Sequence, residues 1–357
     1  MQSLDDFLSR RCPDLLGLGE PTHWAEAFPL FRNKVFRHLV QRHGYRSIAL
    51  EIDCLAARRV DRYVTTGEGD LDQVMATGFS HGFGAFPANR ALVEWLREYN
   101  TGRADQVRFH GFDGPLEMAS APSPRGVLTE LHNFLSAHLD DVPSDVATIE
   151  RLAGEDRRWE DEAVMWGRAK SIGDSPDARE LRLIADDLSG SLDRARPGLP
   201  DGGDLLARTA VGLCRYHALM ADPAPDRMSR LGAQRDAMMA GNLLALPRTF
   251  VSAHNQHLQR AAAALMGARW WNAGTQVAAR IGERYVFIAT DFGSSDALPA
   301  PEPGTLQAYL AAHLPDREVV ETAGIDTGLP PRAGDGRGYV PFDAVAGADG
   351  IAFLRRG

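Results

Sequence analysis

Cysteine is scarce in this sequence. The 357 residues include three cysteines, Cys12, Cys54 and Cys214, which are odd in number and far apart. A disulfide framework needs paired cysteines, and disulfides persist mainly in oxidising compartments. The first residues, Met1 to Asp6, are acidic and lack the basic and then apolar pattern of a secretory signal. We therefore expect no disulfide framework and a cytoplasmic location.

Long apolar runs and basic clusters are also missing. No stretch approaches the roughly 18 consecutive apolar residues of a membrane span. The net charge is -9, and lysine and arginine form no block, whereas binding to nucleic acid needs clustered cations. We therefore expect neither a nucleic-acid partner nor a membrane. The expected partner is a small-molecule substrate, and the sequence makes no prediction of the oligomeric state.

The glycine motifs that bind nucleotides are absent as well. No G-x-x-x-x-G-K-[ST] motif exists, and the pair Gly17 and Gly19 lacks the third glycine of the dinucleotide fingerprint. Gly78 to Gly82 matches the G-x-S-x-G elbow of a serine nucleophile, but that motif follows a strand directly. Leu71 to Thr77, which precedes it here, has a helical pattern. We therefore expect neither a nucleotide cofactor nor a serine nucleophile at this motif.

What the chain does contain is an alternation of short apolar runs and helical patterns. Leu15–Gly19, Ser47–Asp53 and Val107–Asp113 are predicted as buried strands, and amphipathic helices between them are typical of a parallel sheet. Residues 115–246 are predicted to be almost wholly helical. The later pattern predicts a strand over Arg248–Ser252 followed by a helix, two strands over Thr275–Ile281 and Tyr285–Thr290, a helix over Thr305–His313 and a last strand over Gly350–Leu354.

Ionisable side chains follow or end three of the predicted strands. The carboxyl ends of adjacent parallel strands meet at one edge of a sheet, so these side chains are expected to converge. Two carboxylates and three imidazoles in one cleft would perturb one another's pKa values, as general acid-base catalysis requires. The alternative is that some of them are helix caps or buried structural histidines. The set is Glu20, His23, Glu51, His254 and His257.

His23 is the candidate general base of this set. Thr22 is a possible cap of the helix that follows, and a histidine at a helix N-terminus is biased toward the neutral form that accepts a proton. Arg32 follows nine residues later. A continuous helix would turn it about half a turn away from His23, unless a kink at Pro29 brings it back.

The same residues could instead bind a metal ion. Glu20 with His23, and His254 with His257, are spaced three residues apart, as in metal sites carried on helices. No Cys-x-x-Cys or His-Glu-x-x-His motif is present, and we favour acid-base chemistry without a cofactor.

Several motifs, in order along the chain, resemble those of the erythromycin esterase family. That family has a three-layer α/β/α core with a mainly parallel sheet and helical arms over a large cleft. The resemblance therefore implies residues 1–114 and 247–357 as the two parts of the core, and residues 115–246 as a helical insertion over the cleft. The motifs are Gly19-Glu20-x-Thr22-His23 with Glu26 and Arg32, Ile48 to Glu51, Gly78-Phe79, Val93 to Asn100, His110 to Asp113, Arg235-Asp236-x-Met238 with Asn242, Ala253 to His257, and Thr290 to Gly293.

The family hydrolyses macrolide lactones with a histidine that activates water and without an acyl-enzyme. By this resemblance His23 is the base and Glu20 orients it, while Glu51, Arg32, His254 and His257 complete the catalytic set. Trp24 and the Ser80-His81 pair depart from the family pattern, so the substrate can differ. Acyl transfer or cyclisation, and a non-catalytic site for a ligand or metal, are the alternatives. The candidate substrate-binding residues are Trp24, His81, Asp113 and Arg235.

Overall fold

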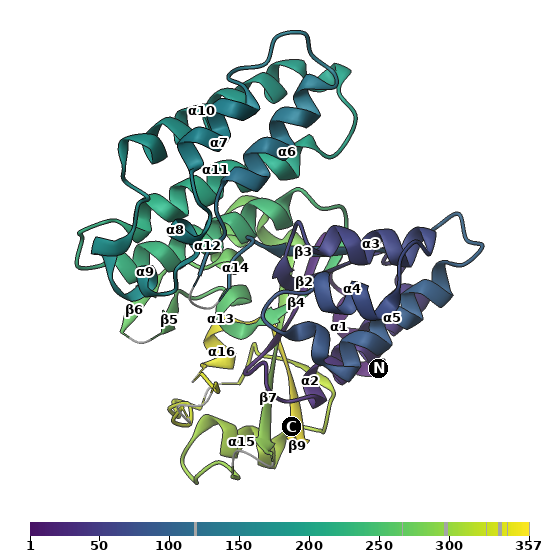
Figure 1. The fold of residues 1–357 in the computed structure, drawn as a ribbon. Coiled ribbons are helices and arrows are strands. Elements are labelled where there is room, and N and C mark those ends of the chain that lie inside the picture. Colours follow the sequence, from purple (N-terminus) through teal and green to yellow (C-terminus); the bar gives the residue numbers. More distant parts are fainter. Residues whose placement is uncertain are drawn as a thin grey trace.

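A seven-stranded sheet forms the centre of the computed structural model (Figure 1), which describes residues 1–117, 120–265, 267–295, 299–325, 327–334, 338–340 and 342–356. The strand order is β3-β2-β4-β1-β7-β9-β8, and all neighbouring strands are parallel except β8, which is antiparallel to β9. The strands are β1 (Leu15–Glu20), β2 (Ser47–Asp53), β3 (Arg108–Asp113), β4 (Thr249–His254), β7 (Tyr285–Ser294), β8 (Val319–Glu321) and β9 (Gly350–Arg356), with β5 (Ala263–Leu265) and β6 (Ala268–Trp270) forming a separate antiparallel pair.

The sheet is buried on both faces because its side chains alternate between two apolar cores. In β7, Val286 and Ile288 belong to one core, whereas Phe287 and Ala289 belong to the other. Successive side chains of a strand point to opposite faces, so a strand covered on both sides reads as a continuous apolar run. This explains why the predicted strands lacked polar alternation.

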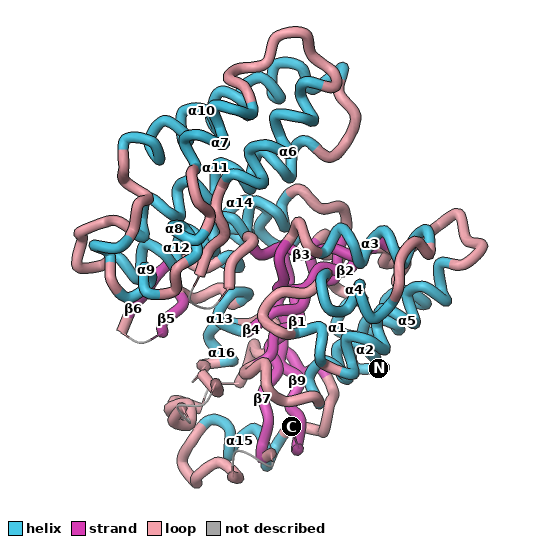
Figure 2. The backbone as a smooth tube through the Cα atoms, viewed as in Figure 1, coloured by secondary structure: helices cyan, strands magenta, loops and turns pink. Residues whose placement is uncertain are grey.

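Helices cover each face of the sheet and complete the predicted three-layer α/β/α core (Figures 1 and 2). The first face carries α1 (Gln2–Ser9), α2 (Ala27–Arg42), α3 (Ala57–Thr66), α4 (Leu71–Thr77) and α5 (Pro87–Asn100). The second carries α12 (Arg227–Leu244), α13 (Asn255–Leu258), α14 (Ala273–Ile281), α15 (Leu306–His313) and α16 (Ala344–Gly347).

A group of helices extends from the core as an arm, with an apolar cluster of its own (Figure 1). Its helices are α6 (Arg125–Ser136), α7 (Val146–Ala153), α8 (Arg157–Glu160), α9 (Ala163–Trp166), α10 (Pro176–Ala195) and α11 (Gly203–Met220). The next helix, α12, packs against both α11 and β3 and so joins the arm to the sheet. The predicted division at residues 115 and 246 stays a prediction. Within the described parts of the chain, no helix has the length and hydropathy to cross a bilayer.

Two predictions along the last third are wrong. Thr275–Ile281 belongs to α14, because the side chain of Asn272 accepts a hydrogen bond from the Thr275 N–H and caps a helix there. A short apolar run fits a buried helix as well as a strand. The second is the end of β7, which continues to Ser294 because Asp291, Phe292 and Ser294 pair with β9. The helix predicted over Thr305–His313, observed as α15, and the last strand, observed as β9, are confirmed.

Candidate active site

The register of the sheet brings the candidate residues together. Glu20 and His254, the last residues of β1 and β4, are direct neighbours in the parallel ladder. Leu50 of β2 is level with Ser252 of β4, which places Glu51 beside the same strand end. The carboxyl ends of three strands therefore present their last polar side chains at one edge, as the sequence predicted.

The two faces of the sheet supply different partners to this edge. Leu16 and Leu18 of β1 lie in the core beneath α1 to α5, so Glu20 points to that face, where α2 carries Arg32. Leu50 packs in the same core, so its neighbour Glu51 points to the opposite face. There α12 brings Arg235, and α13, which follows β4 directly, brings His257.

His23 is held by Glu20 at a distance of 2.7 Å between Nδ1 and Oε1. In the neutral form this bond fixes the proton on Nδ1 and leaves the lone pair on Nε2. Burial lowers the pKa of His23, but the charges of Glu51 and Glu20 outweigh burial and raise it above 6.5. The expected bias toward the neutral form is therefore wrong. Helix α2 begins only at Ala27, and Thr22 does not cap it, so the carboxylates and not a helix terminus set the charge.

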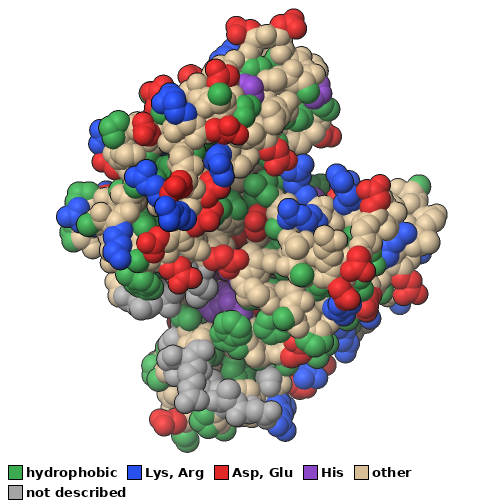
Figure 3. Space-filling model, in the orientation of Figure 1, with side chains coloured by type: hydrophobic (Ala, Val, Ile, Leu, Met, Phe, Trp, Pro, Cys, Tyr) green, Lys and Arg blue, Asp and Glu red, His purple; other side chains and the backbone are tan. Residues whose placement is uncertain are grey.

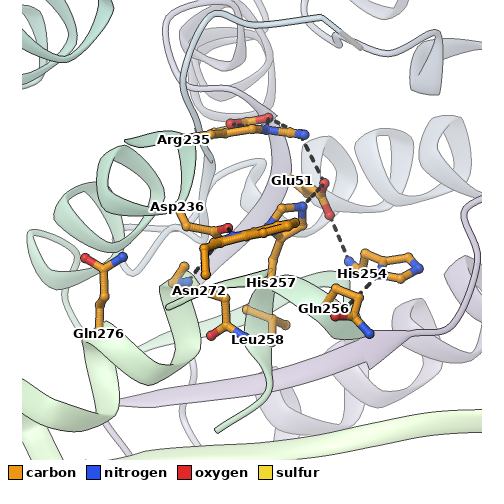
Figure 4. Close-up of polar contacts among 12 residues, drawn as sticks. Glu51, Arg235, Asp236, His254, Gln256, His257, Leu258, Asn272 and Gln276 are labelled. Carbon is orange, nitrogen blue, oxygen red and sulfur yellow. Dashed lines mark hydrogen bonds and ion pairs between the residues drawn. The ribbon is translucent and has the colours of Figure 1, made fainter. Parts of the chain in front are cut away.

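Glu51 lies at the centre of the site (Figure 4). Its Oε2 accepts a 2.8 Å hydrogen bond from the backbone N–H of His254. Its Oε1 lies 3.3 Å from both Arg235 Nη2 and His257 Nε2, and 3.8 Å from His23 Nε2. Burial raises the pKa of Glu51, but these positive neighbours outweigh burial and hold the pKa well below its usual value. The carboxylate is therefore ionised at neutral pH.

His257 is held between two carboxylates. Its Nδ1 donates to Asp236 Oδ1 at 2.8 Å, while its Nε2 faces Glu51. Burial opposes the charged ring, but Asp236 and then Glu51 raise the pKa of His257 to about 10. Asp236 also accepts hydrogen bonds from Trp270 Nε1 and the Ala273 N–H. Sequence reasoning did not assign Asp236 to the site; its only signal was the place beside Arg235 in a family-like motif.

His254 uses both ring nitrogens within the fold. Its Nδ1 accepts from the Gln256 N–H at 3.1 Å, and its Nε2 donates to the Pro21 carbonyl at 3.1 Å. Burial, and then the charge of His23, lower the pKa of His254 to about 3. A neutral ring with no available lone pair cannot transfer a proton. His254 therefore positions the turn that carries His23 and caps α13.

Arg32 borders the same cavity as His23, although α2 runs on through Pro29. Its Nη2 donates to Asn33 Oδ1 and Asn89 Oδ1 at 2.7 and 2.8 Å. Burial lowers the pKa of Arg32 to about 10, so the guanidinium stays charged at neutral pH. The expected half turn between Arg32 and His23 does not apply, because His23 lies in the loop before α2 and not on the helix. Glu20, Glu51, Phe83 and Phe86 complete much of the cavity wall.

The family is decided by comparison with known proteins. Residues 40–343 match the family model described as erythromycin esterase. The chain belongs to the erythromycin esterase family. The matched range contains Glu51, His254 and His257, while Glu20 and His23 lie before it.

This erythromycin esterase family member is similar to erythromycin esterase type I of Escherichia coli, with 25% identity over 145 residues. The match covers 38% of this chain and 33% of that enzyme. The chain therefore spans about a third of the length of the curated relative that it matches. Membership of the family supports an esterase-like hydrolase.

Solved structures show the same fold. A mutant of the erythromycin esterase EreC in its open conformation has a TM-score of 0.70 at 18% identity, covering 96% of this chain and 91% of that one. A Bacillus cereus protein has a TM-score of 0.73 at 19% identity, covering 96% and 88%. A succinoglycan biosynthesis protein has a TM-score of 0.71 at 14% identity, covering 99% and 90%.

A second network of polar side chains contains three of the predicted substrate-binding residues, Asp113, Arg235 and His81. Arg235 donates from Nη2 to Asp113 Oδ2 at 2.6 Å, and His81 Nε2 lies 3.2 Å from the same oxygen. Burial raises the pKa of Asp113, but Arg235 and His81 outweigh burial and lower it. Asp113 is wholly buried, so it positions Arg235 and does not reach substrate. Direct substrate contact by Arg235 and His81 stays a prediction.

Trp24 lies at the rim of the cavity. Its side chain is 63% exposed, and its ring centroid lies 6.4 Å from that of Phe86, which lines the cavity. Phe83 is 4.9 Å from the ring of His23. Figure 3 shows histidine side chains at the bottom of a hollow near the centre of this face, with acidic side chains beside them. The entrance to the polar site is therefore aromatic.

The remaining motifs have structural explanations. Helix α4 precedes Ser80, whose hydroxyl accepts from the Asp53 N–H at 2.9 Å, so the G-x-S-x-G match is no nucleophile elbow. Cys54 is buried, and burial raises the pKa of its thiol to about 12.

Proposed function

We propose that this protein hydrolyses an ester or lactone with His23 as the general base. The observation that carries the proposal is the orientation of His23: Glu20 holds Nδ1 at 2.7 Å, and Nε2 is 3.8 Å from Glu51 Oε1. That gap is too long for a direct hydrogen bond. A water molecule beside it can bond to both atoms, and Nε2 can take its proton as it attacks the carbonyl carbon.

Arg32 is the group best placed to stabilise the negative charge that develops on the carbonyl oxygen. It borders the cavity with His23 and keeps its charge at neutral pH. A fixed cation in a site shielded from water stabilises an oxyanion strongly. After water attacks, His23 holds the transferred proton and can give it to the leaving alkoxide. Between these two proton transfers His23 is an imidazolium cation, and the negative charge of Glu51 stabilises it.

The aromatic entrance supports an apolar substrate. Trp24, Phe86 and Phe83 extend from the surface to His23, and flat aromatic side chains bury large apolar areas. The name of the relatives supports a macrolide-type lactone as the first substrate to assay. Trp24 departs from the small residue usual in the family, which favours a substrate other than erythromycin itself.

The test compares the wild type and His23→Ala on a panel of macrolides and simple esters, with mass spectrometry to detect the products. The wild type is expected to add one water to the substrate, and His23→Ala is expected to lose at least about 100-fold in kcat. Because carboxylates raise the pKa of His23, kcat/KM is expected to rise with pH through a midpoint above 6.5. His132→Ala on α6 is the control and should retain activity. Transfer of the acyl group to an acceptor other than water, or full activity in His23→Ala, would contradict the proposal.

A further inference from the structure

A second histidine cluster lies at the far end of α2 from the active-site cavity. It combines Asp5 of α1, His38 of α2 and His43, the residue that follows the last turn of α2. The Nε2 atoms of both histidines lie 2.6 Å from the same oxygen, Asp5 Oδ1. Arg32, at the cavity, and His43 are 11 residues apart, or about 16 Å along a helix. The cluster is therefore separate from the proposed reaction.

Its donor atoms are those of a transition-metal site. Among the described residues, Asp5, His38 and His43 are the one group of three His, Cys, Asp or Glu side chains whose ligand atoms all lie within 4.8 Å of one another. Two imidazole nitrogens and a carboxylate oxygen suit Zn²⁺ and neighbouring divalent metals. All three side chains are partly exposed, so water can supply the remaining ligand.

The surrounding backbone favours a cation and fixes one ligand. The end of α2 carries the negative end of the helix dipole, which attracts positive charge. The His43 N–H donates to the Leu39 carbonyl at 3.0 Å, and the His43 carbonyl accepts from Arg248 Nη1 at 2.9 Å. These two backbone hydrogen bonds hold His43 in place before any metal binds.

We propose that Asp5, His38 and His43 form a structural site for a divalent transition metal, with Zn²⁺ as its reference ion. The metal takes the place of the hydrogen bonds between the two Nε2 atoms and the carboxylate. Ligands about 2.0–2.2 Å from a tetrahedral ion lie about 3.3 Å apart. Asp5 Oδ1 therefore moves back by about 0.7 Å from each ring. The ion joins α1 to α2.

Equilibrium dialysis of the full chain against Zn²⁺, after chelator treatment and desalting, tests the site. The wild type is expected to retain one zinc equivalent that His43→Gln and Asp5→Asn both lose. Zn²⁺ should also raise Tm in the wild type and leave Tm unchanged in both variants, because the ion stabilises only the folded state that holds its ligands together. Circular dichroism confirms that each variant is folded, and Asp5→Asn provides a second variant should His43→Gln fail.

Two further variants decide where the ion binds. His132→Gln, a histidine outside the cluster, is expected to retain the zinc equivalent, as is His23→Gln in the active site. Loss of the equivalent in His23→Gln, with retention in His43→Gln, would place the ion in the active site and overturn the proposal. Unchanged stoichiometry in both cluster variants would overturn it as well. Neither result depends on whether the protein hydrolyses esters.

Discussion

His257 acts in this site through its charge. Both of its ring nitrogens face carboxylates, Asp236 at 2.8 Å and Glu51 at 3.3 Å. The charge of His257 keeps Glu51 ionised beside His23. The ionised Glu51 raises the pKa of His23, and this effect is larger than the direct lowering of that pKa by the charge of His257. The pKa of His23, the proposed base, is thus raised by two carboxylates: Glu20, which contacts its ring at 2.7 Å, and Glu51, which lies 3.8 Å away.

The raised pKa of His257 predicts that stability falls as the pH rises. In the folded protein this pKa is about 10, against 6.5 for an unperturbed histidine. The folded state therefore holds an extra proton, and the resulting stabilisation is complete below pH 6.5 and is lost as the pH rises through about 10. Urea unfolding of the wild type and His257→Gln should show a difference in unfolding free energy that shrinks across this range. A constant difference would mean that His257 is neutral in the fold.

Roles at the residue scale were the hardest to predict. Sequence placed Glu20, His23, Glu51, His254 and His257 near one edge because strand ends are visible as apolar runs. It could not separate His23, the proposed base, from His254, which caps α13, because that distinction depends on which atoms face the ring nitrogens. Asp236 was missed for the same reason, since its neighbours Trp270 and Ala273 are distant in sequence.

At the scale of the elements, the end of β1 depends on Gly19. A Cβ at this position would lie 2.1 Å from Asn255 Oδ1 and 2.9 Å from the ring of Phe287. Neither neighbour can easily move: Asn255 Nδ2 donates to the Thr290 carbonyl, and Phe287 is wholly buried. The absence of a side chain therefore lets β1 approach α13 closely enough for Glu20 to lie beside His254.

Gly19→Ala is accordingly expected to destabilise the protein by about 2 kcal/mol or more, as other overpacked sites do. Hydrolysis should fall too, because the strand end that carries Glu20 must shift. Gly126→Ala in α6 is the matched control: a Cβ there meets nothing within 4 Å, and alanine favours the helix by about 0.5–1 kcal/mol. Chemical denaturation of both variants measures the contrast, and equal stability in the two would contradict the packing argument.

Element type was predictable where the pattern was long or bounded by clear turns. β1, β2, β3 and β4 were found because each is a short apolar run followed by polar residues. α14 was mistaken for a strand because its run is short, and only the Asn272 cap distinguishes it. The pairing of β8 with β9 was not predicted, since three residues carry too little pattern to indicate a strand.

For the whole molecule, Arg235 joins parts that are distant in the chain. It extends from α12, which also packs on the arm, to Asp113 at the end of β3 and Glu51 in β2. Its neighbours raise the pKa of Arg235 despite burial, with Asp113 the main cause. The joint between arm and core thus contains an ion pair between the wholly buried Asp113 and the partly buried Arg235, and Arg235 also contacts Glu51 of the candidate site.

Loss of this arginine should therefore affect stability and catalysis together. Arg235→Gln leaves Asp113 buried without its cation, and breaking such a pair costs about 3–5 kcal/mol. Arg235→Lys keeps the charge, but lysine has no planar fork with which to contact both carboxylates. Its unfolding free energy and its kcat/KM should therefore lie between those of the wild type and Arg235→Gln. Arg179→Gln is the control, because its pair with Asp174 is exposed to water and is expected to contribute little to stability. Unfolding by urea and kcat/KM should follow the same order; normal activity in a strongly destabilised Arg235→Gln would show that Glu51 is fixed without the arm.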